Sequence, residues 1–185
     1  MPLSDAMIRQ QVYAGAIVIN PEPKDHNFQP ASVDMHLGDT LLYYPRSCPT
    51  ISIDDIPEMS THKIGAGGWT MLSGDFVLGS TLEHIEVPPT LSARLEGKST
   101  VGRMGLIVHA TAGFIDPGFR GNVTLELKNI SNVPVTLHVG MEISQICFDT
   151  MIGEVLRPYG SEGLRSHYQD SEGTRAAQPR RRRRK

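Results

Sequence analysis

Most of this 185-residue chain consists of short stretches in which hydrophobic and polar residues alternate. A period of two is typical of half-buried β-strands, because successive side chains point to opposite faces of a sheet. The pattern predicts strands at residues 17–19, 29–38, 41–44, 70–72, 76–80, 84–87, 106–108, 123–127, 134–139 and 143–149. Many short strands separated by turns indicate a mainly β fold, either a sandwich or a jelly-roll-like barrel.

The same pattern predicts little helix. Ser4 is a suitable N-cap for a short helix over residues 6–12, and Gly15 suits the position just after its end. Residues 45–68 are polar and rich in turn-forming residues, so we expect a loop there, and the alternation is lost beyond Met151. The 18 glycines and 13 prolines agree with a chain that turns often.

The length suits a single domain with a buried core. Cys48 and Cys147 are the only cysteines, and two cysteines so far apart indicate no disulfide framework, as expected in a reducing cytoplasm. The sequence contains neither a secretory signal pattern nor a run of 18 apolar residues, so we expect neither export nor membrane insertion.

Charge is unevenly distributed along the chain. The net charge is −2, but residues 180–185 are all basic, which leaves 12 cationic and 20 acidic residues, or −8, in residues 1–179. This negative field disfavours a general nucleic-acid surface, and an anionic substrate would need local cations or a metal ion. The basic tail is expected to be a disordered, solubilising end, with contact to nucleic acid as the alternative.

Residues 94–129 contain the densest set of chemically useful groups. Gly97-Lys98-Ser99-Thr100 and Arg103 place two hydroxyls and two cations on one small-residue turn, which suits an oligophosphate. An ordinary polar turn is the alternative, because the complete G-x-x-x-x-G-K-[ST] phosphate loop is absent. Residues 111–121 then bring three glycines around Asp116, and glycines allow a ligand to approach the backbone closely.

One carboxylate stands out on the strand expected at residues 123–127. Counting by twos places Glu126 and Thr124 on the face opposite Val123 and Leu125. If the apolar face is the core, Glu126 faces a cleft or a subunit interface. A solvated or salt-bridged surface residue is the alternative interpretation.

A zinc deaminase of the cytidine type would need H-x-E followed by P-C-x-x-C. His84-Ile85-Glu86 satisfies the first half, but the chain contains no C-x-x-C. We therefore reject zinc hydrolysis and expect His84 and Glu86 on the solvent face of a strand.

The ordered series of residues from Arg94 to Asn129 resembles the dCTP deaminases, which share a fold with the trimeric dUTPases. Further matching segments lie at residues 29–34, 37–38, 79–83, 88, 140–141 and 143–145. The resemblance covers about Leu3 to Tyr168, with a poor match over residues 46–68. It implies a dUTPase-like distorted jelly-roll or β-barrel with a short N-terminal helix and a flexible C-terminal lid. The expected division is a dCTP deaminase domain over residues 1–168 and a flexible segment with the basic tail over residues 169–185.

Deamination without zinc requires a group that removes a proton from water and returns it to the base, and one carboxylate, Glu126, can do both. By resemblance, Ser99 and Arg103 of a neighbouring subunit hold this water, Asp116 binds the 3′-hydroxyl and Phe119 packs on the sugar. The backbone of Ala110, Thr111 and Ala112 would read the pyrimidine, Lys98, Thr100 and Arg103 would face the phosphates, and Gln145, Tyr159, His167 and Tyr168 complete the substrate-binding candidates. Tyr168 matches the lysine-tyrosine pair of the family's lid, whereas His167 stands where that pair usually has lysine.

The resemblance also implies partners and products. We expect dCTP or dUTP as ligand, Mg²⁺ carried by the triphosphate without protein ligands to the metal, and a homotrimer with sites shared between subunits. Ala112-Gly113-Phe114 resembles the bifunctional branch, which forms dUMP and diphosphate, whereas the purely deaminating branch tends to carry His-Arg at positions 113 and 114. Deamination alone, a dUTPase without deaminase activity and a regulatory nucleotide-binding module remain alternatives.

Overall fold

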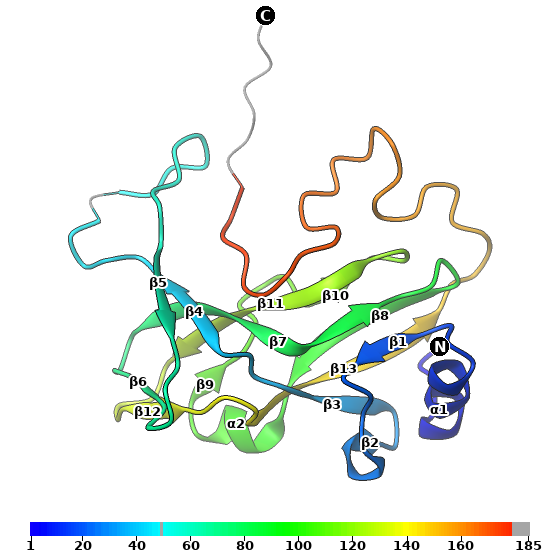
Figure 1. Cartoon of the computed structure of the whole chain (residues 1–185), viewed down its shortest axis with the longest axis horizontal. Coiled ribbons are helices and arrows are strands. Elements are labelled where there is room, and N and C mark those ends of the chain that lie inside the picture. Colours follow the sequence, from blue (N-terminus) through cyan, green and yellow to red (C-terminus); the bar gives the residue numbers. More distant parts are fainter. Residues whose placement is uncertain (49, 179–185) are drawn as a thin grey trace, which may run out of the picture.

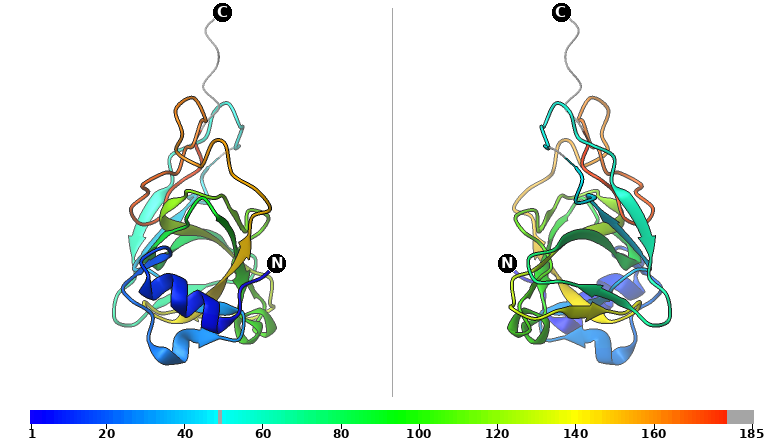
Figure 2. Two further views of the ribbon diagram at one scale, coloured as in Figure 1. Left: turned by 90° about the vertical axis from the view of Figure 1, so that its right-hand side faces the viewer. Right: turned by 90° about the vertical axis from the view of Figure 1, so that its left-hand side faces the viewer.

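The structure is a computed structural model that describes residues 1–48 and 50–178, so the basic tail at 180–185 lies outside the described residues. Two antiparallel sheets curve around a common interior, and the fold is mainly β, as predicted (Figures 1 and 2). The larger sheet has the order β5-β4-β7-β11-β9, with β1 also paired to β7, and the second has the order β10-β8-β13-β3-β2. Strands β6 and β12 form a separate pair.

The larger sheet consists of β1 (Val18–Asn20), β4 (Thr40–Tyr43), β5 (Ser60–Lys63), β7 (Phe76–Glu86), β9 (Leu106–Ile107) and β11 (Arg120–Asn129). The second consists of β2 (Phe28–Gln29), β3 (Ser32–His36), β8 (Leu91–Gly97), β10 (Phe114–Ile115) and β13 (Glu142–Thr150). The remaining elements are β6 (Trp69–Met71), β12 (Val135–Leu137), the helices α1 (Asp5–Tyr13) and α2 (Ser99–Arg103), and a 3₁₀ turn over Asp25–Asn27.

The core lies between the two large sheets. On β11 the odd-numbered residues Leu125 and Leu127 are fully buried, and the even-numbered residues Thr124, Glu126 and Lys128 are half-buried, as the alternation predicted. On β3 both faces are buried, because Asp34 is only 3% exposed although Val33 and Met35 fill the core behind it. The polar face of β3 is therefore internal, which the alternation did not indicate.

The first helix follows its predicted signals. The Ser4 hydroxyl accepts a hydrogen bond from the Met7 amide, and Gly15 follows the helix with a φ of +70°. Ile8 is fully buried and holds the helix against the sheets. The longest helix among residues 1–48 and 50–178 has nine residues, and none of the described helices has the length and apolar content to cross a membrane.

Three local predictions were wrong. Residues 45–68 are not only loop, because β5 pairs there with β4. The sequence of β5, Ser-Thr-His-Lys, is polar and carries no hydrophobic signal. The stretch 97–103 is not a simple turn, because α2 begins after Lys98. The strands expected at 76–80 and 84–87 form the single strand β7.

Strand β7 stays continuous because residues of β11 form hydrogen bonds with its backbone where the pairing of the two strands is irregular. The register between the two strands shifts between Asn122 and Thr124. The Asn122 side-chain amide donates to the carbonyls of residues 81, 82 and 83, at 3.0–3.3 Å, and the Val123 amide donates to the Thr81 hydroxyl at 3.0 Å. These bonds satisfy the backbone that a bulge would leave unpaired.

Residues 151–178 contain no helix or strand, which agrees with the loss of periodicity after Met151. They cross above β10 and β11 at the upper side of Figure 1. Residues 169–177, called the strap below, run beside β11. The hydrogen bonds from the Asp170 amide to the Arg120 carbonyl and from the Asn122 amide to the Ser171 carbonyl are both 2.9 Å. The contacts with the β domain therefore continue past residue 168, where the sequence placed the boundary.

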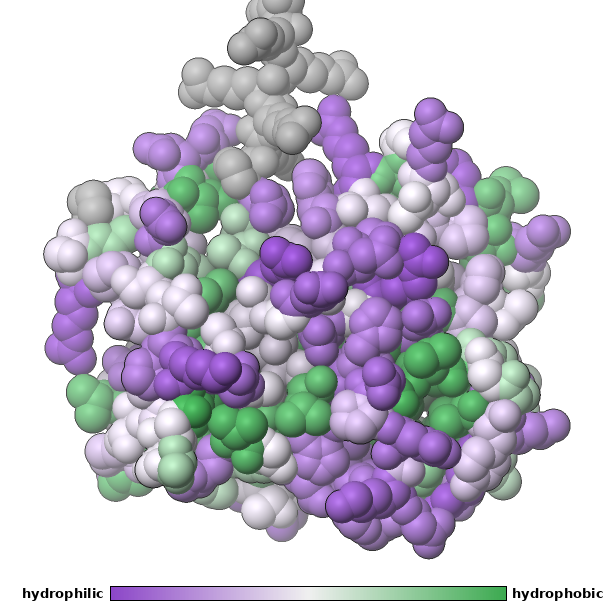
Figure 3. All heavy atoms as spheres, viewed as in Figure 1, coloured by the Kyte–Doolittle hydropathy of each residue, from purple (hydrophilic) through white to green (hydrophobic). Residues whose placement is uncertain are grey.

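On the face shown in Figure 3, hydrophobic residues form small, separate groups among hydrophilic ones. Scattered apolar groups of this kind are normal on a folded protein.

Candidate active site

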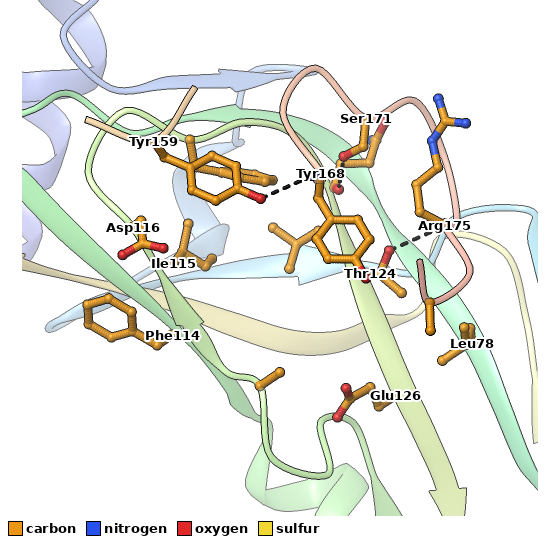
Figure 4. Close-up of a pocket in the computed structure, with 15 residues that line it drawn as sticks. Leu78, Phe114, Ile115, Asp116, Thr124, Glu126, Tyr159, Tyr168, Ser171 and Arg175 are labelled. Atoms are coloured by element: carbon orange, nitrogen blue, oxygen red, sulfur yellow. Dashed lines mark hydrogen bonds between the residues drawn. The ribbon is translucent and has the colours of Figure 1, made fainter. Parts of the chain in front are cut away.

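A pocket of about 360 Å³ lies between β10, β11 and the C-terminal segment (Figure 4). Its walls bring together residues from distant parts of the sequence. They are Leu78, Ala112, Phe114, Ile115, Asp116, Phe119, Asn122, Val123, Thr124, Glu126, Tyr159, Tyr168, Ser171, Arg175 and Ala177. Six predicted site residues lie among them: Ala112, Asp116, Phe119, Glu126, Tyr159 and Tyr168.

Glu126 lies at one end of the pocket, as a half-buried side chain of β11. Its Oε2 atom accepts hydrogen bonds from the backbone N–H of Ala110 at 2.8 Å and of Thr111 at 3.1 Å. The Glu126 amide in turn donates to the Val108 carbonyl at 3.0 Å. Because the loop holds one oxygen of the carboxylate, its orientation is fixed while Oε1 is left for a ligand or a water molecule.

The opposite wall is aromatic. Phe119 is 9% exposed, and its ring centroid lies 5.9 Å from that of Tyr159. The Tyr159 hydroxyl accepts a hydrogen bond from the Tyr168 amide at 3.0 Å, which closes the segment over the pocket. Burial raises the pKa of the Tyr159 hydroxyl, and the bond from Tyr168 opposes this shift. Tyr159 therefore acts as a neutral wall residue near pH 7.

Two glycines let the C-terminal segment come this close. A Cβ on Gly118 would lie 2.7 Å from the Pro158 Cβ and 3.1 Å from the Tyr159 nitrogen. At Gly121, with a φ of +141°, a Cβ would lie 2.5 Å from the Ser171 hydroxyl and 2.8 Å from its nitrogen. A side chain at either position would displace the segment that forms the upper wall.

The residues of α2 do not line this pocket. Ser99, Thr100 and Arg103 are exposed, and the helix lies at the lower side of Figure 1, away from the C-terminal segment. The sequence therefore predicted one site whose parts lie in two places within a single chain.

Lys98, the N-cap residue of α2, is engaged by two acids. Its Nζ atom lies 2.6 Å from Asp34 Oδ2 and 2.7 Å from Glu142 Oε2, and the Asp34 side chain is only 2% exposed. Partial burial opposes the charge of Lys98, but the two carboxylates outweigh it and raise the pKa of the ammonium. The hydrogen bond from Lys98 correspondingly lowers the pKa of Glu142. Lys98 thus ties α2 to β3 and β13.

Neighbouring polar side chains complete this group. We call it the Lys98 cluster, and it consists of Lys98, Asp34, Glu142, Gln29, Ser32 and Gln145. Gln29 Nε2 donates to Asp34 Oδ2 at 3.0 Å, and the Ser32 hydroxyl donates to Gln145 Oε1 at 3.0 Å. Asp34 Oδ1 is buried without a hydrogen-bond partner among the described residues. The candidate Gln145 therefore lies with Lys98 and not with Glu126.

The fold resembles solved deaminases and dUTPases. The dCTP deaminase of Agrobacterium tumefaciens superposes with a TM-score of 0.66 at 23% identity, over 81% of this chain and 48% of that chain. A dUTPase of Staphylococcus bacteriophage 80alpha gives a TM-score of 0.50 at 12% identity, over 76% of this chain and 94% of that chain. At these identities the likeness concerns the fold alone.

Sequence comparison is more specific. A dUMP-forming dCTP deaminase of Halobacterium salinarum is 45% identical, over 96% of this chain and 94% of its own length. One from Mycolicibacterium vanbaalenii is 42% identical over 94% of this chain and 93% of its length, and a dCTP deaminase of Halorubrum lacusprofundi is 41% identical over 96% and 90%. The model of the dCTP deaminase-like family matches residues 2–151. The chain belongs to the dCTP deaminase-like family.

Several residues that line the pocket of this dCTP deaminase-like chain were not predicted as site residues from the sequence. Thr124 was placed on the Glu126 face of β11 but not proposed as a site residue, and the same alternation extends to Asn122. Ser171, Arg175 and Ala177 lie in the strap, whose sequence has no periodicity and gave no signal. His167 is exposed and does not line the pocket.

Among residues 1–48 and 50–178, no group of three or more His, Cys, Asp or Glu side chains is arranged to hold a metal ion. The pocket offers the single carboxylates Asp116 and Glu126, and Glu126 is engaged by backbone N–H groups.

Proposed function

We propose that this protein deaminates dCTP and cleaves the triphosphate, releasing dUMP, diphosphate and ammonia. The observation that carries the proposal is the Glu126 carboxylate, fixed by two backbone N–H groups at the end of a pocket of about 360 Å³. Relatives named as dUMP-forming dCTP deaminases at 42–45% identity support the same product.

Glu126 is proposed as the group that moves protons during deamination. It takes a proton from water, whose oxygen bonds to C4 of the cytosine, and it returns the proton to the base. The proton of the new C4 hydroxyl then passes to the amino nitrogen, the bond from C4 to that nitrogen breaks, and ammonia leaves as the C4 carbonyl forms. The loop at Ala110–Ala112 lies beside the carboxylate and is proposed to orient the pyrimidine through its backbone.

The sugar is proposed to lie on the aromatic wall. Asp116 lies away from Glu126 (Figure 4), where its carboxylate can accept a 3′-hydroxyl. Phe119 lines the same pocket beside Tyr159, and its ring can pack on the deoxyribose. Tyr159 and Tyr168 close the upper side through the hydrogen bond that joins them.

A homotrimer would complete the site. Ser99, Thr100 and Arg103 lie outside the pocket of their own chain, so we propose that they reach the substrate bound by a neighbouring subunit. There Ser99 and Arg103 would hold the attacking water, and Thr100 and Arg103 would face the phosphates. Lys98 and Gln145 would support that surface from the Lys98 cluster, and His167 would contribute less than a lysine.

Mg²⁺ is proposed to travel with the triphosphate and to neutralise part of its charge. Removal of divalent ions with EDTA should depress activity, and added Mg²⁺ should restore it where trace Zn²⁺ does not. Stoichiometric zinc bound to active protein would contradict this proposal. We place the reaction in the cytoplasm, where the two free cysteines, Cys48 and Cys147, would stay reduced.

The decisive experiment is incubation with dCTP and Mg²⁺, followed by separation of the nucleotides by base and charge, with dUTP as a second substrate. Formation of dUMP and diphosphate from dCTP supports the proposal. Accumulation of dUTP would identify the second candidate, a deaminase without triphosphate cleavage, as in the relative named simply dCTP deaminase. Unchanged dCTP would overturn both, and cleavage of dUTP alone would identify a dUTPase.

A further inference from the structure

Arg175 is a cation of the pocket wall to which the chemistry above gives no role. It belongs to the strap and lines the same pocket as Glu126 and Tyr168 (Figure 4). Among residues 1–48 and 50–178, it is the only lysine or arginine in that wall, and no ion pair holds it there. Its guanidinium group lies at the rim and points away from Glu126.

The chain is held at Arg175 and at the residue before it. The Arg175 amide donates to the Thr124 hydroxyl at 3.2 Å, and the Thr174 hydroxyl donates to the Thr40 carbonyl at 2.7 Å. Thr124 stands two residues before Glu126 on the same face of β11. The strap therefore anchors Arg175 one strand step from the proposed catalytic carboxylate, and only its long side chain remains free to move.

The other cations of this region are directed elsewhere. Arg157 and Arg165 line a second cavity of about 400 Å³, which shares Asp116 and Tyr159 with the pocket. The Arg120 Nε atom lies 2.9 Å from Asp170 Oδ1. The pocket itself carries the carboxylates Asp116 and Glu126, which repel an anionic ligand unless a cation lies nearby. Arg175 is the described side chain placed to offset that repulsion.

We infer that Arg175 binds the phosphate groups of the nucleotide from the docked strap. The inference rests on the proposed function, since it takes a nucleoside triphosphate as the ligand. A guanidinium group forms paired, charge-assisted hydrogen bonds to phosphate oxygens, and its flexible stem can swing from the rim to meet them. Because the phosphates carry charge before and during the reaction, Arg175 should act on substrate binding more than on turnover.

The test compares Arg175→Ala with the matched control Arg165→Ala, which removes the same charge from the same irregular segment outside the pocket. We expect Arg175→Ala to raise the KM for dCTP about tenfold, with kcat within about twofold of wild type. Competitive inhibition by deoxycytidine, which has no phosphate, should be unchanged. Arg175→Lys should recover part of the affinity, because lysine keeps the charge but not the paired hydrogen bonds. Arg165→Ala should behave as wild type.

Gly121→Ala provides an independent arm, because a Cβ at this position collides with Ser171 and should undock the strap. If Arg175 acts from the docked strap, adding Arg175→Ala to Gly121→Ala should raise KM little further. Fully additive effects, an unchanged KM in Arg175→Ala, or an equal loss of deoxycytidine binding would each overturn the inference. The wild-type protein is assayed with dCTP in parallel. If the wild type turns over dCTP and the variants give one of these results, the inference fails alone; if the wild type leaves dCTP unchanged, the proposed function fails.

Discussion

The pocket around Glu126 and the Lys98 cluster both contain residues predicted for one active site, yet they are built differently. The pocket depends on backbone N–H groups, aromatic side chains and an irregular segment hydrogen-bonded to β11. The Lys98 cluster depends on ion pairs from Lys98 to Glu142 and to Asp34, and the Asp34 side chain is almost fully buried. Changes in the pocket should therefore affect chemistry with little effect on stability, and changes in the Lys98 cluster should affect stability first.

The largest effect is expected at Glu126. Glu126→Gln keeps the shape and can still accept the two N–H bonds, but it cannot transfer a proton, so deamination should fall by at least about 10²-fold. Steady-state assays with dCTP measure the loss, and thermal unfolding serves as the control, because folding should be nearly unchanged. Normal deamination by this variant would remove Glu126 from the proposed role.

The next prediction joins the two regions. Arg103→Ala and Glu126→Gln should each be nearly inactive, yet unfolding and refolding them together should restore a fraction of wild-type activity. Mixed trimers would contain some sites in which an intact α2 meets an intact Glu126, whereas other sites carry one or both changes. Sedimentation should show trimers, and mass spectrometry should show mixing. A monomeric protein, or mixed trimers without recovery, would contradict a site shared between subunits.

A smaller effect, on stability, is expected in the Lys98 cluster. Lys98→Met leaves the Asp34 carboxylate buried without its cation, so the free energy of unfolding should fall by about 2–4 kcal/mol. Lys63→Met is the matched control, because Lys63 also pairs with an aspartate, Asp39, but its side chain is 78% exposed, and it should cost less than about 1 kcal/mol. Equal losses in denaturant titrations would show that burial of Asp34 is unimportant.

The smallest effect concerns pH. The hydrogen bond from Lys98, aided by the charges of His36 and His26, holds the pKa of Glu142 below its ordinary value of 4.5. A lowered carboxylate pKa stabilises the fold above pH 4.5, and this contribution is lost as the pH falls through the lowered value. The stability difference between wild type and Glu142→Gln should therefore shrink below about pH 4.5, and it should stay under about 1 kcal/mol because Glu142 is 42% exposed. A difference that grows toward low pH would have the wrong sign.

Hydrophobic alternation predicted much of the fold because most strands bury one face. It located Glu126 for this reason, since β11 keeps a strict period of two across residues 120–129. It failed for β5, whose residues are polar throughout, and for Asp34, whose strand is buried on both faces.

The rest of the candidate site depends on contacts between distant segments. The Lys98 cluster joins β3, β13 and the start of α2, and the sequence does not state which acid Lys98 meets. The strap has no periodic pattern, so its position beside β11, and with it Ser171 and Arg175, could be known only from the structure. The division of the site into two regions likewise follows from topology.

The strap also bears on how the protein behaves in concentrated solution. Beside residues 120–124, the strap supplies the partners of β11 on the side away from β7, including both 2.9 Å backbone bonds. A strand with unpaired N–H and C=O groups can pair with another chain and seed aggregation. A substitution that undocks the strap, such as Gly121→Ala, would uncover this edge of β11. The segment that closes the pocket therefore also covers an exposed strand edge. Its loss should increase aggregation of the stored protein as well as reduce turnover.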